Sequence, residues 1–298
     1  MEIEAAVALL DASPDHLVLH RMRGRPECAP APRDESDGVR LGLVVDFETT
    51  GLDPDRDRVI QLSALPFAFD RHRGAVLDVY DQLVAFEDPG RPIPEAVTAL
   101  TGITDDHVRG RAIPDADVYD LARRSALLVA HNARFDRPFW DARFPDACDL
   151  YWGCSMNCVD WRAEGVNSAA LDYVLYEHCG LFFDGHRADA DCLATLHVLT
   201  TPFASGGTPL LRVIEAARIY TSRLSAVGAP YEKKDVLKER GYRWFPGGQD
   251  RPKAWYVDVD DDAVEAECEW LREAVYNGRD GWRTDRFNGR RRYSREVG

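Results

Sequence analysis

The stretch VVDFETTGLD holds two carboxylates at the end of an apolar run. Side chains in a strand alternate, so Asp46 and Glu48 would point to one face while Phe47 points to the other. Two carboxylates that converge on one point repel each other, and their chemistry suits a divalent cation. A solvated strand end would also explain an Asp-x-Glu pattern. Because an apolar strand has no packing reason to end in two charges, we predict a functional role for the pair.

A third carboxylate follows a second apolar run, in LLVAHNARFDRPF. We expect Asp136 in the first turn of a helix, close to the positive end of that helix. It could merely stabilise the helix N-terminus, and this alternative stays open on the segment alone. His131 and Asn132 are expected to satisfy backbone groups in the turn between the strand and the helix.

The segment DGHRADADCLATLHVL adds an acid and a histidine. We predict Asp191 on a helix and His186 in the loop or first turn ahead of it, so that the carboxylate would hold metal while the imidazole leans over the same site. A histidine suits proton abstraction near neutral pH, although a lone histidine is more often a surface or capping residue. Asp189 competes with Asp191, but Asp191 fits the inward-facing side of the helix better.

The elements that must position these residues alternate between strand and helix patterns. Apolar, β-branched runs predict three adjacent strands and a fourth strand just before His131, and four other segments have helical spacing. The predicted strands are 41–47, 59–69, 75–86 and 126–130, and the predicted helices are 115–125, 137–143, 168–178 and 188–199. This order predicts an α/β fold with a mixed β-sheet flanked by helices.

Breaks rich in Pro, Gly and charge divide the chain into three parts. Residues 1–38 are predicted to form a helix over 2–11, an extended segment over 16–22 and a linker that ends near Gly38. The acidic motifs all fall in the second part, 39–203, which we expect to be the catalytic domain. The third part, 208–298, is predicted as a small α+β module.

The C-terminal module concentrates aromatic and basic side chains in KKDVLKERGYRWFPGGQDRPKAWYVDV. We predict a helix over 233–240, two strands, GYRWF and AWYVDV, and a helix over 261–275. The module could offer a surface that stacks bases and contacts phosphates of a single strand. Alternatively, its tryptophans fill the core of a small domain. The arginines at 290–292 belong either to a mobile, charged tail or to a set of phosphate contacts.

The formal net charge of −14 and the cysteine usage limit the classes of function. Broad attachment to duplex DNA needs many Lys and Arg, so an acidic chain is better suited to grip a few nucleotides at a strand end. Seven scattered cysteines lack the spacing of a zinc finger or a disulfide framework. With neither a signal peptide nor an apolar stretch near the roughly 20 residues of a membrane span, we expect a cytoplasmic protein without membrane contact.

Four segments, DFETTGLD, LTGITDDHVRG, AHNARFDRPF and GHRADADC, occur in this order and resemble the successive motifs of the DEDDh family of 3′→5′ exonucleases. The best-known member is the epsilon proofreading subunit of the bacterial replicative DNA polymerase, and residues 154–188 look like a stand-alone bacterial subgroup with a C-terminal extension. The resemblance covers about residues 40–200 and implies a ribonuclease H-like fold. It implies two Mg²⁺ or Mn²⁺ ions, with His186 as general base and four metal ligands: Asp46, Glu48, Asp136 and Asp191.

The resemblance also implies a reaction and substrate contacts. Terminal phosphodiesters would be hydrolysed at the 3′ end of single-stranded or frayed DNA, and nucleoside 5′-monophosphates would be released. Thr49 and Leu52 match positions that contact the terminal nucleotide and its 3′-hydroxyl. Phe47, Leu52 and Phe135 could also stack or wedge against terminal bases, although core packing is the alternative for Phe47 and Phe135.

Three alternatives stay open. A 3′→5′ exoribonuclease would use the same chemistry, because contacts to the 2′-hydroxyl distinguish RNA from DNA. The chain could also serve a DNA polymerase or a repair protein as an accessory, with the C-terminal module binding this partner. A nucleic-acid-binding module without catalysis is the third alternative, and the complete set of acids together with His186 argues against it.

Overall fold

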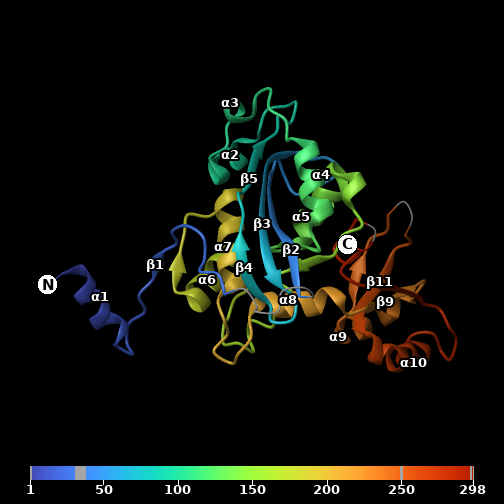
Figure 1. The fold of residues 1–298 in the computed structure, drawn as a ribbon. Helices are drawn as coiled ribbons and strands as arrows, with labels where there is room; N and C mark the ends of the chain where they lie inside the picture. Colours follow the sequence, from blue (N-terminus) through green and yellow to red (C-terminus); the bar gives the residue numbers. More distant parts are fainter. Residues whose placement is uncertain (1, 31–37, 249–250, 296, 298) are drawn as a thin grey trace. The chain divides into compact units, whose positions relative to one another are not determined.

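The computed structural model describes residues 2–30, 38–248, 251–295 and 297 (Figure 1). The chain divides into two compact units, of which the first is Met1–Ala217 with Arg290–Gly298 and the second is Arg218–Gly289. Within the described ranges, no helix is long and apolar enough to cross a membrane. The predicted division into residues 1–38, 39–203 and 208–298 stays a prediction.

The first unit is built on a mixed, six-stranded sheet. β2, which carries the first two acids, pairs antiparallel with β3 and parallel with β6. β6 also pairs parallel with β7, while β4 and β5 both pair antiparallel with β3. The strands are β2 (Val39–Thr49), β3 (Val59–Asp70), β4 (Ala75–Val79), β5 (Leu83–Phe86), β6 (Leu127–Ala130) and β7 (Trp152–Cys154).

Helices cover both faces of this sheet (Figure 1). α7 (Ala188–Thr200) packs on β2 and β3 and is itself contacted by α6 (Leu171–Cys179). On the other side of the sheet lie α4 (Asp115–Arg124) and α5 (Ala133–Arg143). The mixed sheet with helices on both faces confirms the predicted α/β fold.

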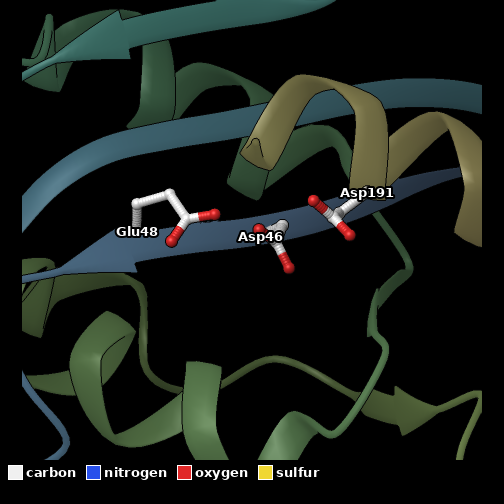
Figure 2. A group of neighbouring side chains, drawn as sticks. All are labelled: Asp46, Glu48 and Asp191. Atoms are coloured by element: carbon white, nitrogen blue, oxygen red, sulfur yellow. The ribbon is translucent and has the colours of Figure 1, made fainter. Parts of the chain in front are cut away.

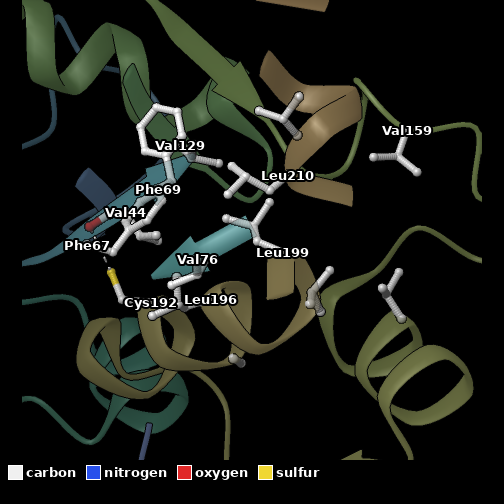
Figure 3. Close-up of a cluster of buried hydrophobic side chains, with 14 of the residues drawn as sticks. Val44, Phe67, Phe69, Val76, Val129, Val159, Cys192, Leu196, Leu199 and Leu210 are labelled. Carbon is white, nitrogen blue, oxygen red and sulfur yellow. Dashed lines mark hydrogen bonds between the residues drawn. The ribbon is translucent and has the colours of Figure 1, made fainter. Parts of the chain in front are cut away.

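Two apolar cores hold these layers together, one on each face of the sheet. On the α7 side, Val44 of β2 packs with Leu196 and Leu199 of α7 (Figure 3). Because strand side chains alternate, the next residue, Val45, points into the opposite core with Trp140 of α5. β2 is therefore fixed from both faces, which gives the side chains at its end a defined position.

Several limits differ from the predicted ones, mainly where the chain turns. The run 75–86, predicted as one strand, forms β4 and β5, which pair with different parts of β3. α5 begins at Ala133 rather than at residue 137, directly after Asn132, whose backbone is left-handed (φ 69°). Two short helices between β5 and α4 were not predicted: α2 (Glu95–Thr101) and α3 (Asp105–Val108).

The N-terminal segment contains a helix and a short strand. α1 (Ile3–Asp11) matches the predicted helix, and none of its residues is buried. β1 (His20–Arg21) lies in the predicted extended segment and pairs parallel with β8 (Leu181–Phe182), which shortly precedes α7. The part of the predicted linker at residues 31–37 falls outside the described residues.

The second unit is a four-stranded antiparallel sheet with the order β10-β11-β9-β12. Its core gathers Leu224, Leu237 and Leu271 between the sheet and two helices. The elements are β9 (Thr221–Val227), α9 (Lys234–Glu239), β10 (Arg243–Phe245), β11 (Ala254–Asp260), α10 (Val264–Ala274) and β12 (Arg283–Phe287). The two strands predicted over GYRWF and AWYVDV are present as β10 and β11, which pair antiparallel, whereas β9 and β12 were not predicted.

The arginine-rich end differs from the mobile tail that its composition suggested. Part of it forms β12, and the described residues from Arg290 on group with the first unit, which also contains most of α8 (Pro209–Arg218). There Tyr293 is buried in the apolar core, Arg290 forms an ion pair with Asp149 at 2.6 Å, and Arg292 donates a hydrogen bond to a carbonyl of α8. The end of the chain is thus part of the packing of the first unit.

Candidate active site

Three carboxylates predicted from two separate motifs come together in the first unit (Figure 2). Asp46 and Glu48 extend from the end of β2, and Asp191 extends from the first turn of α7. One oxygen atom of each carboxylate lies within 4.8 Å of the others. Within the described part of the chain, this group does not include the competing Asp189, which forms an ion pair with Arg187 at 3.3 Å.

Strand alternation explains why the first two acids face α7. Phe47, the residue between them, is buried on the opposite face, where its ring centroid lies 6.4 Å from that of Trp140. Its neighbours Asp46 and Glu48 therefore point to the α7 side of the sheet. The β2–β3 register shifts directly after Glu48, so the regular pairing ends beside the acids.

Two glutamines fix the first turn of α7 to the sheet. Gln61 Oε1 on β3 accepts a hydrogen bond from the backbone N–H of Ala188 at 3.4 Å. Gln82 Nε2 donates to the carbonyl of Asp189 at 2.9 Å and to Ser63 Oγ at 2.7 Å. Neither glutamine was predicted to contribute, because each contacts a residue more than 100 positions away.

The fourth predicted acid lies deeper than the other three. Asp136 is in the first turn of α5 and only 1% of it is exposed to solvent. Its Oδ1 is buried with no hydrogen-bond partner. An unpaired buried carboxylate oxygen is costly unless a cation or proton binds there. Asp136 is not one of the three closest acids, but its charge raises the pKa of Asp46.

Burial and mutual repulsion raise the pKa values of the clustered acids. Burial, followed by repulsion from Asp136, Asp191 and Glu48, raises the pKa of Asp46 well above its ordinary value. Burial and the charge of Asp191 raise the pKa of Glu48 to about 7, and burial raises that of Asp191 to about 6. A cation among the carboxylates would remove this repulsion. The oxygen-only donor set and the orphaned Asp136 oxygen fit a hard divalent cation, which this cluster could hold.

His186 is exposed in the loop that precedes α7. The backbone N–H groups of His186 and Arg187 hydrogen-bond to the Asp191 carboxylate, the latter at 2.9 Å, and the imidazole is close enough to lower the pKa of Asp191. His186 has a left-handed backbone (φ 65°), as does Asn132 before α5. Such backbone strain in non-glycine residues is often found at functional sites.

The N-terminal strand β1 supports this loop, which the sequence did not suggest. The backbone N–H groups of His20 and Met22 donate to carbonyls of Gly180 and Phe182, at 2.9 and 2.8 Å. The Arg21 guanidinium also binds the Asp184 carboxylate at 2.9 Å. Asp184 lies two residues before the histidine, so β1 fixes the strand from which the His186 loop departs.

His131 acts as the expected structural residue in the turn before α5. One ring nitrogen hydrogen-bonds to Ser155 Oγ at 2.9 Å and the other to the carbonyl of Ala169 at 2.8 Å. Burial lowers its pKa to about 4, so the ring is neutral at physiological pH. Through these bonds His131 ties the strand end beside Asn132 and Asp136 to two neighbouring loops.

The three predicted substrate contacts differ in exposure. Leu52 is 83% exposed, so its side chain is accessible to a ligand. Thr49 is buried, and its hydroxyl donates a hydrogen bond to the carbonyl of Gly51. Phe135 is half-buried with its ring centroid 5.1 Å from that of Phe139. Their roles toward a nucleotide stay predictions.

A family model described as an exonuclease, RNase_T, matches residues 43–199, just over half of the chain. The chain belongs to this exonuclease family. The matched range contains all three clustered acids together with Asp136 and His186.

Curated relatives of this exonuclease carry the name DNA polymerase III PolC-type. The one from Streptococcus mutans is 38% identical over 105 residues, which cover 34% of this chain and 7% of that protein. The one from Lacticaseibacillus paracasei is 37% identical over 184 residues, which cover 57% of this chain and 12% of that protein. The exonuclease therefore spans only a small part of the length of these relatives.

Solved exonucleases also align with the chain. Exonuclease X in complex with 5′ overhanging duplex DNA gives a TM-score of 0.41 at 24% identity and covers 53% of this chain and 89% of that chain. Escherichia coli exonuclease I in complex with an oligonucleotide gives a TM-score of 0.49 at 18% identity and covers 74% of this chain and 63% of that chain.

The acidic cluster makes the stability of the metal-free exonuclease depend on pH. Glu48 and Asp191 have pKa values of about 7 and 6 in the folded protein, against ordinary values of 4.5 and 3.8. The folded state therefore binds these protons more tightly than the unfolded chain does. Their stabilising contribution is present below about pH 4 and is lost as the pH rises to about 7.

We expect Glu48→Gln to stabilise the chelated protein relative to wild type by an amount that grows between about pH 4.5 and 7 and then levels off. Urea unfolding in EDTA at a series of pH values measures this difference. Subtracting the wild-type curve of unfolding free energy against pH from the Glu48→Gln curve removes the contribution of His131. The lowered pKa of His131 makes stability rise with pH, opposite to the effect of the acids. A difference that stays flat or declines with pH would contradict the repulsion.

Proposed function

We propose that the chain is a metal-dependent 3′→5′ exonuclease that hydrolyses terminal phosphodiesters of single-stranded or frayed DNA and releases nucleoside 5′-monophosphates. The observation that carries this proposal is the convergence of Asp46, Glu48 and Asp191 within a region that matches the exonuclease family. The names of the curated relatives, which are DNA polymerases, support DNA as the substrate.

In this proposal all four acids contribute to one metal site. Asp46, Glu48 and Asp191 would hold a pair of Mg²⁺ or Mn²⁺ ions, and the buried Asp136 would complete the set through its unpaired oxygen. When bound, the ions supply Lewis acidity beside the scissile phosphate. The carboxylates fix where this charge lies, and this arrangement orients the terminal phosphate.

His186 is the proposed general base. Its unprotonated ring nitrogen takes the proton from the attacking water, and its exposed loop lets it approach once the strand end is bound. The backbone bonds from residues 186 and 187 to Asp191 keep this loop beside the acids. Thr49 and Leu52 contact the terminal nucleotide and its 3′-hydroxyl in this proposal, and Phe135 stacks against a terminal base.

Matched DNA and RNA oligonucleotides of one sequence, each labelled internally, test the substrate and the product. With Mg²⁺ or Mn²⁺ we expect DNA to yield nucleoside 5′-monophosphates, identified by chromatography, several-fold faster than RNA does. EDTA should stop the release from both strands. Faster degradation of RNA would reassign the enzyme as an exoribonuclease, and release that survives EDTA would refute the metal dependence.

We also propose a DNA polymerase or a repair protein as a partner of this exonuclease. The support is that the matched region lies within much longer polymerase chains in the curated relatives. Co-purification of a polymerase with the full chain supports this role, whereas an isolated chain that binds no polymerase at micromolar concentration speaks against it.

A further inference from the structure

Lysine is confined to one short segment of this chain. The sequence has 37 Lys and Arg residues, yet its four lysines all fall between positions 233 and 253. That segment carries seven basic and three acidic residues, a net charge of +4 in a chain of −14. Two of its arginines, Arg240 and Arg243, pair with Glu267 and Asp258 outside the segment. The attraction for a negatively charged partner therefore rests mainly on the lysines.

Two of these lysines lie next to aromatic rings in the second unit. Lys234 Nζ lies 2.9 Å from the Tyr231 hydroxyl and 4.3 Å from the centroid of that ring. Lys238, one helical turn later on α9, places its Nζ 5.7 Å from the Trp255 ring centroid. Trp255 in turn contacts Trp244 edge-on, with ring centroids 5.5 Å apart. These five residues form a row that we call the lysine–aromatic strip.

Trp255 packs partly against the core of the second unit, but the exposed rings of the strip are not explained by the need to fill a small core. That need is met by Tyr242, which is buried and stacked on Trp270 at 5.8 Å. In contrast, Tyr231 is 78% exposed and Trp244 is 50% exposed. Large exposed aromatic rings beside cations are characteristic of surfaces that bind a ligand with flat, apolar faces and negative charge.

We propose that the lysine–aromatic strip binds single-stranded DNA. Unpaired bases offer flat faces that stack on Trp244 and Tyr231, and the ammonium groups of Lys234 and Lys238 contact the phosphates between them. Duplex DNA is a poor ligand, because its base faces are covered by stacking and pairing. This site goes beyond the proposed hydrolysis, since a chain with an inactive acidic cluster would still bind through it.

Fluorescence anisotropy with a labelled oligothymidylate and the full chain in EDTA tests this binding without hydrolysis. We expect Trp244→Ala and Tyr231→Ala each to raise Kd by about 5- to 150-fold, the usual effect of removing one stacking partner. Trp244→Phe should retain most of the affinity. Tyr220→Ala removes an exposed aromatic residue outside the strip and is the matched control, which should bind as wild type does.

A salt series separates a phosphate contact from a structural role. Replacing both Lys234 and Lys238 with Gln should lower the slope of log K against log salt by about 1.4, because each phosphate contact to a single strand contributes about 0.7. Arg272→Gln, which removes a charge on α10, should leave the slope unchanged. A misfolded unit would instead lose its thermal transition.

Wild-type affinity and salt slope in the Trp244→Ala and double lysine variants would overturn the proposal. Tighter binding of the corresponding oligouridylate, lost in the same variants, would overturn the assignment to DNA. The outcome is independent of the proposed nuclease activity: a chain that binds but does not hydrolyse refutes the activity alone, and one that hydrolyses dinucleotides but binds no oligothymidylate refutes the strip alone.

Discussion

Replacement of Asp46 by asparagine is expected to lower turnover by at least about 10³-fold and, in EDTA at neutral pH, to raise stability. Asparagine keeps the size of the side chain and removes the charge that would hold a cation. The loss corresponds to several kcal/mol of transition-state stabilisation from a metal site. The gain in stability has a different cause. Burial and repulsion from Asp136, Asp191 and Glu48 raise the pKa of Asp46, so its ionised form destabilises the metal-free protein.

Two measurements on the same variant check these opposite effects. Steady-state hydrolysis of an oligonucleotide gives the turnover, and thermal unfolding in EDTA gives the stability. Asp189→Asn is a matched control, because Asp189 lies in the same turn as Asp191 but outside the acidic cluster. Asp46→Asn with at least a tenth of wild-type turnover would remove Asp46 from the site.

Replacement of His186 by glycine should lower turnover by about 10²–10⁴-fold without weakening metal binding, because only the proton acceptor is lost. Glycine adopts positive φ without a steric cost, so the left-handed backbone at residue 186 is retained in this variant. The variant should therefore be at least as stable as wild type. Added imidazole should restore part of the turnover, since it can take the proton in place of the missing side chain.

Turnover as a function of imidazole, together with metal titration and thermal unfolding, distinguishes a base from a structural residue. His16→Ala removes an exposed histidine of the N-terminal segment and should change none of these quantities. If His186→Gly keeps full turnover, or loses metal affinity along with it, His186 is not the general base.

The sequence predicts best what depends on neighbours along the chain. Alternation on one strand was enough to bring Asp46 and Glu48 to the same face, with Phe47 behind them in the core. Helical spacing was enough to prefer Asp191 to Asp189, and the structure has Asp191 with the other two acids. In each case a local period determines the direction of a side chain.

What the sequence did not predict depends on contacts between distant segments. Gln61 and Gln82 hold α7 across more than 100 residues, and Arg21 reaches Asp184 across 163. No local pattern encodes such pairs. β12 (Arg283–Phe287) was missed because RTDRF has a single apolar residue, so its composition resembles a tail although it pairs with β9.

The most direct test of the central claim is the direction of digestion of a single strand labelled at its 5′ end. With Mg²⁺ and wild-type protein, the account predicts a ladder of labelled fragments that shorten by one nucleotide at a time. Asp46→Asn should leave the strand intact under the same conditions. Immediate release of a labelled mononucleotide would show digestion from the 5′ end and would contradict the account.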